Sequence, residues 1–164
     1  MDKNPSSKPT VFISYSHKDE AWLKRLVSQL GVLEKQRLLD HWDDTRIGPG
    51  KEWRKEIEAA INKAVVAILL VSADFLTSDF ILNEEVPLLL QRREKEGLWI
   101  FPIIVRPCNW EEVQWLSPVQ VRPKLGKPLS IEKNPKIESD LRDIAKEVLA
   151  ILRLIAPQTN PVGQ

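Results

Sequence analysis

The chain has 164 residues, 43% of them hydrophobic and 29% charged, which is typical of one globular domain with its own core. Lys and Arg number 24 and Asp and Glu 23, for a net charge of +1. This balance argues against a surface built throughout for nucleic acid. One cysteine, Cys108, excludes an internal disulfide framework and a multi-cysteine zinc site. With only two histidines, His17 and His41, we expect no metal site.

No apolar run approaches the ~20 residues that a membrane-spanning helix needs, and the first ten residues are too polar for a secretory signal. We therefore expect a cytoplasmic protein with no membrane partner. Three segments are predicted: a flexible tail at 1–9, one domain at 10–155, and a tail or linker to a further domain at 156–164.

Short β-branched runs alternate with amphipathic segments along the chain. In order, the patterns predict a strand at 10–16, a helix from 19 to near Gly31, a strand at 38–42, a loop at 43–51, a helix at 52–63, a strand at 64–71, a loop at 72–79, a helix at 80–96 kinked by Pro87, a strand at 98–105, a small edge strand at 128–131, and a helix at 137–155.

Strands that alternate with helices predict right-handed βαβ units and therefore an α/β fold. We expect a parallel sheet of about five strands with helices on both faces. Ligands bind such sheets beyond the carboxyl ends of the strands. The loops at 14–19, 43–51 and 72–84 are therefore the candidate site.

Sequence signatures of dinucleotide, nucleoside triphosphate, serine hydrolase and zinc protease sites are missing from the chain. Cys108 could be a nucleophile, but a lone cysteine is more often a small buried apolar residue. His17 could be a general base, or a polar loop residue near a helix start.

Phe80 and Glu84 are four residues apart in a predicted helix and so share one face. A ring beside a carboxylate at this sheet edge suits a sugar nucleotide, since the ring can stack on a base while the carboxylate accepts hydrogen bonds from ribose. The alternative is that Phe80 belongs to the core and Glu84 is a solvated acid favoured by the helix N-terminus.

Four segments carry a resemblance to a known family. They are VFISYSHKDE (11–20), LLDHWDDTRIGPGKEWRKEIEAAI (38–61), AILLVSADFLTSDFILNEE (67–85) and IIVRPCNW (103–110), with a looser match at GKPLS (126–130). In order and spacing they resemble a bacterial Toll/interleukin-receptor (TIR) domain. The resemblance implies a flavodoxin-like, three-layer sandwich.

The family resemblance also implies two possible functions. Many TIR domains are protein-interaction modules that self-associate through the loop after the second strand. Here the implied self-association residues are Arg46, Ile47, Gly48, Pro49, Gly50 and Trp53, with Ile47 expected to be exposed; a merely flexible loop is the alternative.

Other members cleave NAD⁺ at the nicotinamide–ribose bond, with a catalytic glutamate in a pattern like WCxxE. In this chain the pattern corresponds to 80–84, so the resemblance selects Glu84, with Phe80 in place of the tryptophan. Glu85 follows directly, and a register shift of one residue would select it instead. The other implied substrate contacts are Ser14, Tyr15, Ser16, His17, Trp42, Asp43 and Ser72.

The implied reaction passes through an oxocarbenium-like ribose whose charge Glu84 offsets, without a metal or another cofactor. Attack by water gives ADP-ribose, and attack by the adenine or a ribose hydroxyl gives a cyclic form. Activity is expected to require assembly, in a defence response triggered by a sensor or effector domain. The alternatives are a non-catalytic scaffold and a nucleotide sensor without turnover.

Overall fold

The computed structural model describes residues 8–130 and 135–155, and within them the sheet has four strands, all parallel. The strand order is β2-β1-β3-β4. The strands are β1 (Thr10–Ser14), β2 (Asp40–Trp42), β3 (Val66–Val71) and β4 (Trp99–Ile104). The predicted tails at 1–9 and 156–164 fall largely or wholly outside the described residues.

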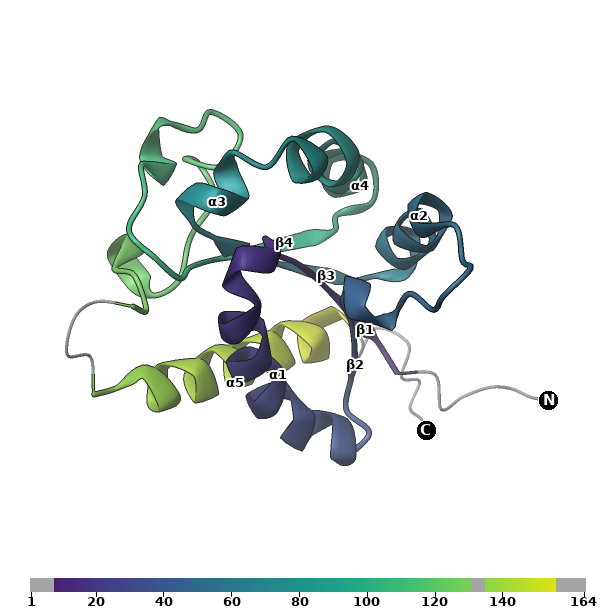
Figure 1. Cartoon of the computed structure of the whole chain (residues 1–164). Helices are drawn as coiled ribbons and strands as arrows, with labels where there is room; N and C mark the ends of the chain where they lie inside the picture. Colours follow the sequence, from purple (N-terminus) through teal and green to yellow (C-terminus); the bar gives the residue numbers. More distant parts are fainter. Residues whose placement is uncertain (1–7, 131–134, 156–164) are drawn as a thin grey trace.

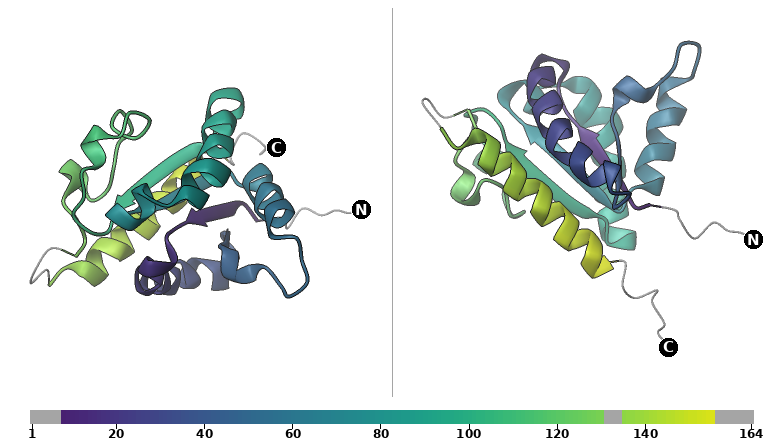
Figure 2. Two further views of the ribbon diagram at one scale, coloured as in Figure 1. Left: turned by 45° about the horizontal axis from the view of Figure 1, so that its top comes forward. Right: turned by 90° about the horizontal axis from the view of Figure 1, so that it is seen from below.

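Helices cover both faces of the sheet, as predicted. Figure 1 shows α1 (Glu20–Lys35) and α5 (Ile137–Ile155) below it, and α2 (Trp53–Lys63), α3 (Ala73–Leu76) and α4 (Val86–Glu96) above it. Seen from below, α1 and α5 lie side by side across the lower face (Figure 2). Short turns of helix occur at His17–Asp19 (η1), Asp44–Arg46 (η2), Ile81–Glu85 (η3), Trp110–Glu112 (η4) and Lys124–Gly126 (η5).

Alternate side chains of each strand enter two separate cores. In β3, Ile68 faces the α1 and α5 side, whereas Leu69 faces the α2 and α4 side. All six residues of β3 are buried, which is why its sequence is apolar without alternation. The predicted α/β sandwich, with helices on both faces of a parallel sheet, is confirmed.

The predicted end of the first helix and the predicted loop at 72–79 were wrong. Helix α1 continues past Gly31 to Lys35, because Leu33 still packs against the core, and it ends where Arg37 adopts a left-handed φ of 62°. The predicted loop at 72–79 contains the one-turn helix α3, because the Ser72 side chain caps the Phe75 amide.

The predicted fifth strand at 128–131 is not a strand in the part of the chain that the structure describes. Leu129 and Ser130 do lie along β4, since their amides donate to the carbonyls of Ile104 and Val105 at 2.9 and 3.0 Å. Residue 131 lies outside the described residues. The preceding Pro128 has no amide hydrogen that it could donate to such a pairing.

Ile68→Ala is expected to lower the free energy of unfolding by about 2–5 kcal/mol, because Ile68 is fully buried in the central strand. Urea denaturation measures the change, provided that the dependence of the unfolding free energy on urea concentration is the same for both proteins. Val32→Ala on the exposed end of α1 is the matched control and should cost under about 0.5 kcal/mol. Similar losses at both positions would contradict the assigned core.

Candidate functional site

A cavity of about 560 Å³ opens at the carboxyl ends of β1 and β3. Here the chain switches from one side of β1 to the other, because β1 lies between β2 and β3. Such a switch point is where doubly wound sheets bind ligands. The cavity is lined by Tyr15, Ser16, His17, Lys18, Asp44, Ile47, Trp53, Ile57, Ser78, Phe80, Ile81 and Glu85.

Glu85 is the buried acid of this cavity. It is only 5% exposed, and the Ser14 hydroxyl at the end of β1 donates a hydrogen bond of 2.5 Å to its Oε1. Ser14 is itself buried. The carboxyl group is therefore held against the sheet edge by a residue that directly follows the apolar part of β1.

Burial raises the pKa of Glu85 from its ordinary value of 4.5 to about 7, since removal from water disfavours the charged form. The negative charge of Asp44 raises this pKa further, while the Ser14 hydrogen bond and His17 partly oppose the rise. Near neutral pH the group is divided between acid and carboxylate, as suits a residue that exchanges protons or offsets charge.

A π-turn, η3, brings Glu85 to the cavity. The Val86 amide donates to the Ile81 carbonyl, five residues back, instead of four as in an α-helix. The turn therefore holds one residue more than an α-helical turn, and it places Phe80 and Glu85 on the same cavity. Pro87 explains the wide turn, because it lacks an amide hydrogen and its ring would clash with the Asn83 carbonyl of a continuous α-helix.

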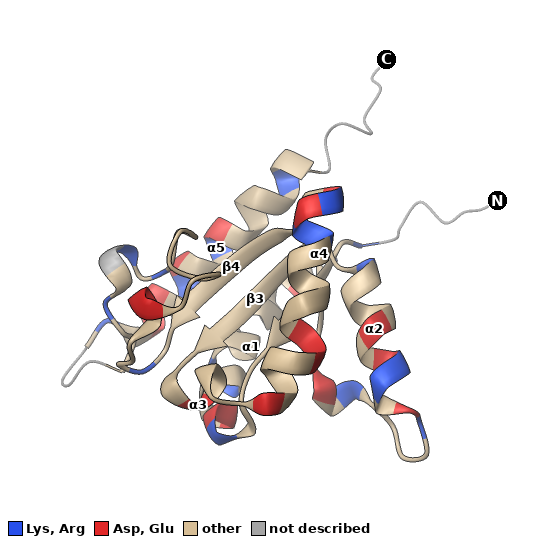
Figure 3. Ribbon diagram, turned by 90° about the horizontal axis from the view of Figure 1, so that it is seen from above, with Lys and Arg blue, Asp and Glu red and all other residues tan. Residues whose placement is uncertain are grey.

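Glu84, the residue selected from the sequence, lies outside the large cavity. Its Oε1 accepts a hydrogen bond from Nη1 of Arg54 on α2, and it lines a smaller neighbouring cavity of about 160 Å³. Figure 3 shows the acidic segment that leads into α4 beside the basic end of α2. The π-turn thus separates two adjacent carboxylates, turning Glu85 inward and Glu84 towards α2.

Asp44 joins the loop after β2 to the loop after β1. It accepts a hydrogen bond of 2.8 Å from the Tyr15 hydroxyl, and its other oxygen lies 2.7 Å from Nε2 of His17. Burial and the Asp44 contact raise the pKa of Tyr15 above its ordinary value, so the phenol stays protonated and remains a donor. These contacts fix one wall of the cavity.

Two aromatic rings form another part of the cavity wall. Trp53, the first residue of α2, meets Phe80 edge-on with ring centroids 5.2 Å apart. Both rings are partly exposed, at 44% and 36%, so they can contact a ligand. Ile47 also lines this cavity and packs against the α2 side of the core. It is half-buried, so the prediction that it is exposed was wrong.

Four predicted substrate contacts do not line the cavity, because each has a structural partner. Ser14 is buried and donates to Glu85. Trp42 stacks on Phe12 with centroids 5.5 Å apart. Asp43 caps η2 by accepting from the Thr45 amide and contacts His41. Ser72 caps α3. Tyr15, Ser16, His17 and Phe80 line the cavity with Glu85, and Ser14 contacts Glu85. Arg46, Gly48, Pro49 and Gly50 do not line it; Pro49 and Gly50 are exposed, and Arg46 lies 3.8 Å from Glu34.

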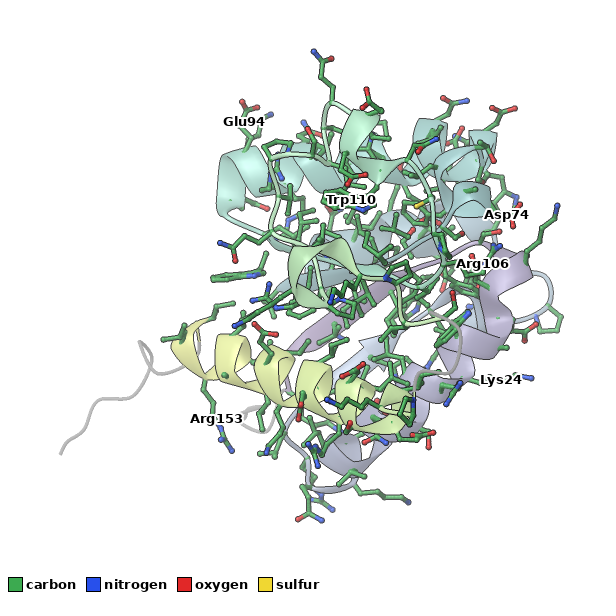
Figure 4. The ribbon with its side chains drawn as sticks, turned by 90° about the vertical axis from the view of Figure 1, so that its left-hand side faces the viewer. Lys24, Asp74, Glu94, Arg106, Trp110 and Arg153 are labelled. Atoms are coloured by element: carbon green, nitrogen blue, oxygen red, sulfur yellow. The ribbon has the colours of Figure 1, made fainter. Side chains whose placement is uncertain are left out.

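Arg106 is an important residue that sequence reasoning missed. Its guanidinium contacts Asp19 at 2.7 Å and Asp74 at 2.6 Å, and Asp19 also accepts a bond of 2.5 Å from Ser72. Figure 4 shows Arg106 and Asp74 on the same side of the molecule. The network ties the loops after β1, β3 and β4 together. An arginine directly after an apolar strand, with acids following the other strands, was the available signal.

Cys108 is a partly buried free thiol whose pKa is raised mainly by burial. This favours an unreactive thiol over a nucleophile. Among the described residues, no group of three or more His, Cys, Asp or Glu side chains is arranged to hold a metal ion. No helix in the same part of the chain is long and apolar enough to cross a membrane.

The domain is a flavodoxin-like α/β domain. Its parallel sheet has the order β2-β1-β3-β4, with helices on both faces and a cavity at the carboxyl ends of β1 and β3. The family model described as "TIR domain" matches residues 11–128. The chain belongs to the TIR domain family. It is also similar to a curated protein of Sinorhizobium fredii named "Uncharacterized protein y4lF", with 35% identity over 140 residues. That match covers 85% of this chain and 42% of the relative's length.

Solved TIR domains share the fold at low identity. The TIR domains of the activated Roq1 resistosome match 86% of this chain and 99% of their own, with a TM-score of 0.62 and 17% identity. The TIR domain of the Toll-related receptor TRR-2 from Hydra magnipapillata matches 87% of this chain and 97% of its own, with a TM-score of 0.56 and 19% identity. The RPS4 and RRS1 TIR domain heterodimer matches 87% of this chain and 97% of its own, with a TM-score of 0.55 and 17% identity.

Glu85→Gln is expected to gain stability relative to the parent protein as the pH rises. Because the fold raises the pKa of Glu85, its contribution to stability is complete below about pH 4.5 and is lost as the pH rises through about 7. Glutamine cannot ionise, so between pH 5 and pH 8 the difference in free energy of unfolding should shift by about 2–3 kcal/mol in favour of the variant. Denaturant unfolding across this range measures it.

Glu94→Gln is the matched control, since Glu94 is exposed on α4. It should show no comparable shift. A constant difference between Glu85→Gln and the parent from pH 5 to pH 8 would contradict the raised pKa.

Proposed function

We propose that this domain is an NAD⁺ glycohydrolase in which Glu85 is the catalytic carboxylate. The observation that carries the proposal is the buried Glu85 carboxyl, held by Ser14 and turned by the π-turn into a cavity with an aromatic wall. The TIR domain family includes enzymes that cleave NAD⁺. The sequence pattern favoured Glu84, but only the adjacent Glu85 lines the large cavity.

The cavity has the size and chemistry for part of a dinucleotide. Its volume of about 560 Å³ is within the range of small-molecule sites. Trp53 and Phe80 offer ring edges and faces to a nicotinamide or adenine ring, and Tyr15 and Ser16 also line the cavity. Glu85 then lies among these groups, where it can face the ribose between base and diphosphate.

In the proposed reaction the bond between the ribose carbon and the nicotinamide nitrogen breaks. Nicotinamide leaves with the electron pair and becomes neutral, and positive charge develops on the ribose ring. The Glu85 carboxylate offsets that charge. When water attacks the ribose carbon, Glu85 accepts the proton that the water loses, and the products are nicotinamide and ADP-ribose. Attack by a hydroxyl or the adenine of the same molecule gives a cyclic product.

The test measures, by chromatography, the nicotinamide that is released from NAD⁺ by protein clustered on beads. Glu85→Gln should lower kcat at least about 100-fold, because it removes the charge that stabilises the transition state. Glu84→Gln should retain turnover at saturating NAD⁺. Glu94→Gln, on the exposed surface of α4, is the control for a lost carboxylate elsewhere.

The opposite result, with release abolished by Glu84→Gln and kept by Glu85→Gln, would return the catalytic role to Glu84. No release by the clustered parent protein, with assembly confirmed by light scattering, would favour the non-catalytic scaffold. NAD⁺ binding without release would favour the nucleotide sensor.

Self-association is the proposed means of activation. The similar TIR domains of the Roq1 resistosome and of the RPS4 and RRS1 heterodimer are parts of assemblies. In this chain the tip of the loop after β2 is exposed at Pro49 and Gly50, and Ile47 of the same loop lines the cavity. A neighbouring subunit that contacts the tip could therefore act on the site. We infer that a sensor or effector domain supplies the clustering.

Specific activity should accordingly rise with protein concentration and on clustering. Pro49→Glu should reduce that gain several-fold, because it places a charge where an interface would have to desolvate it. Gln91→Glu adds the same carboxylate to an exposed position on α4 and is the matched control. Dilution series of the three proteins measure the effect; a specific activity independent of concentration would count against it.

A further inference from the structure

Trp53 and Ile57 of α2 form a partition between two cavities. Both residues line the large cavity that contains Glu85, and both also line the smaller cavity that contains Glu84. The position of the first two turns of α2 therefore sets the width of the large cavity on this side. Whatever holds the start of α2 against the π-turn also sets the space available beside Glu85.

Two contacts hold the start of α2 to the segment 80–84, and a third, within α2, links them. Nη1 of Arg54 donates to the Glu84 carboxylate, the Arg54 guanidinium lies 4.9 Å from the Trp53 ring centroid, and Trp53 meets Phe80 edge-on at 5.2 Å. The same arginine thus pairs with the acid next to Glu85 and packs on the ring that forms the wall. The contacts act together, since movement of Arg54 affects both the ion pair and the ring.

We propose that the Arg54–Glu84 ion pair is a positioning contact that fixes the aromatic wall of the cavity relative to Glu85. This inference rests on the proposed function of Glu85. Glu84 is one peptide unit from Glu85, and Arg54 is one peptide unit from Trp53, so the ion pair joins the catalytic turn to the wall directly. Glu84 is then required for substrate fit and not for the chemical step.

The ion pair is accessible, with side-chain exposures of 58% for Arg54 and 30% for Glu84. Water-exposed pairs add little to global stability, so both partners can be exchanged without unfolding the domain. The pair is therefore suited to a charge-reversal experiment. It should affect the local geometry of the cavity more than the overall unfolding transition.

The decisive test is reversal of the ion pair, one side at a time and then both. Arg54→Glu and Glu84→Arg each place like charges opposite one another, and each should raise KM for NAD⁺ about fivefold while kcat falls less than about twofold. The double variant restores an ion pair with its direction reversed, and KM should return to within about twofold of the parent value. The clustered protein is used throughout.

Lys55→Glu is the matched control, because it makes the same charge change on α2 as Arg54→Glu. Lys55 pairs instead with Glu52, directly before the same helix, at 3.4 Å. It should leave KM within about twofold of the parent value. A double variant as impaired as the single variants would overturn the proposal. Loss of kcat in Glu84→Arg without recovery in the double variant would instead give Glu84 a chemical role.

Amide hydrogen exchange separates this inference from the proposed function. Peptides that cover 53–57 and 80–86 should exchange faster in each single variant and return to the parent rate in the double variant. That result without nicotinamide release from any protein would retain the positioning contact and reject the enzyme. Unchanged exchange in the single variants would overturn the positioning contact, whether or not the parent protein cleaves NAD⁺.

Discussion

The site depends on one costly arrangement, a carboxyl group buried beside a single hydroxyl donor. An ionised carboxylate loses much of its hydration when it is buried, and one hydrogen bond from Ser14 only partly replaces it. Asp44, a second negative group of the same cavity, opposes ionisation further. The surrounding fold must therefore supply enough rigidity to keep Glu85 in this unfavourable position. The cost is the reason that its proton affinity suits chemistry near neutral pH.

That rigidity comes from hydrogen bonds between the loops at the carboxyl edge of the sheet. Asp19 is almost fully buried and receives hydrogen bonds from Ser72 and Arg106, so the loops after β1, β3 and β4 share one anchor. Asp44 joins the loop after β2 to Tyr15. In the cavity itself, Asp44 holds Tyr15 and His17, whereas the start of α2 is held by the more exposed Arg54–Glu84 and Trp53–Phe80 contacts.

Sequence patterns predicted the elements whose physics is local. The apolar run of β3, the amphipathic face of α5 and the presence of Phe80 at the site all follow from spacing and burial. The roles of Trp42 and Asp43 could not be predicted in the same way. They depend on β2 being only three residues long and paired with β1, which places Trp42 on Phe12 and leaves Asp43 to cap the next turn. The choice between adjacent glutamates depended on a helix type that spacing alone does not reveal.

The π-turn has a consequence for how this site can vary among related sequences. Its extra residue sits between an aromatic ring and an acid that must both reach one cavity, so the helix can lose a residue there and still present a glutamate at the shorter α-helical spacing. Two homologues could then carry the same acid at the same point in space while their alignments assign it to different columns. For this chain, the position of a carboxylate relative to Ser14 is a better criterion of equivalence than its distance along the chain from Phe80.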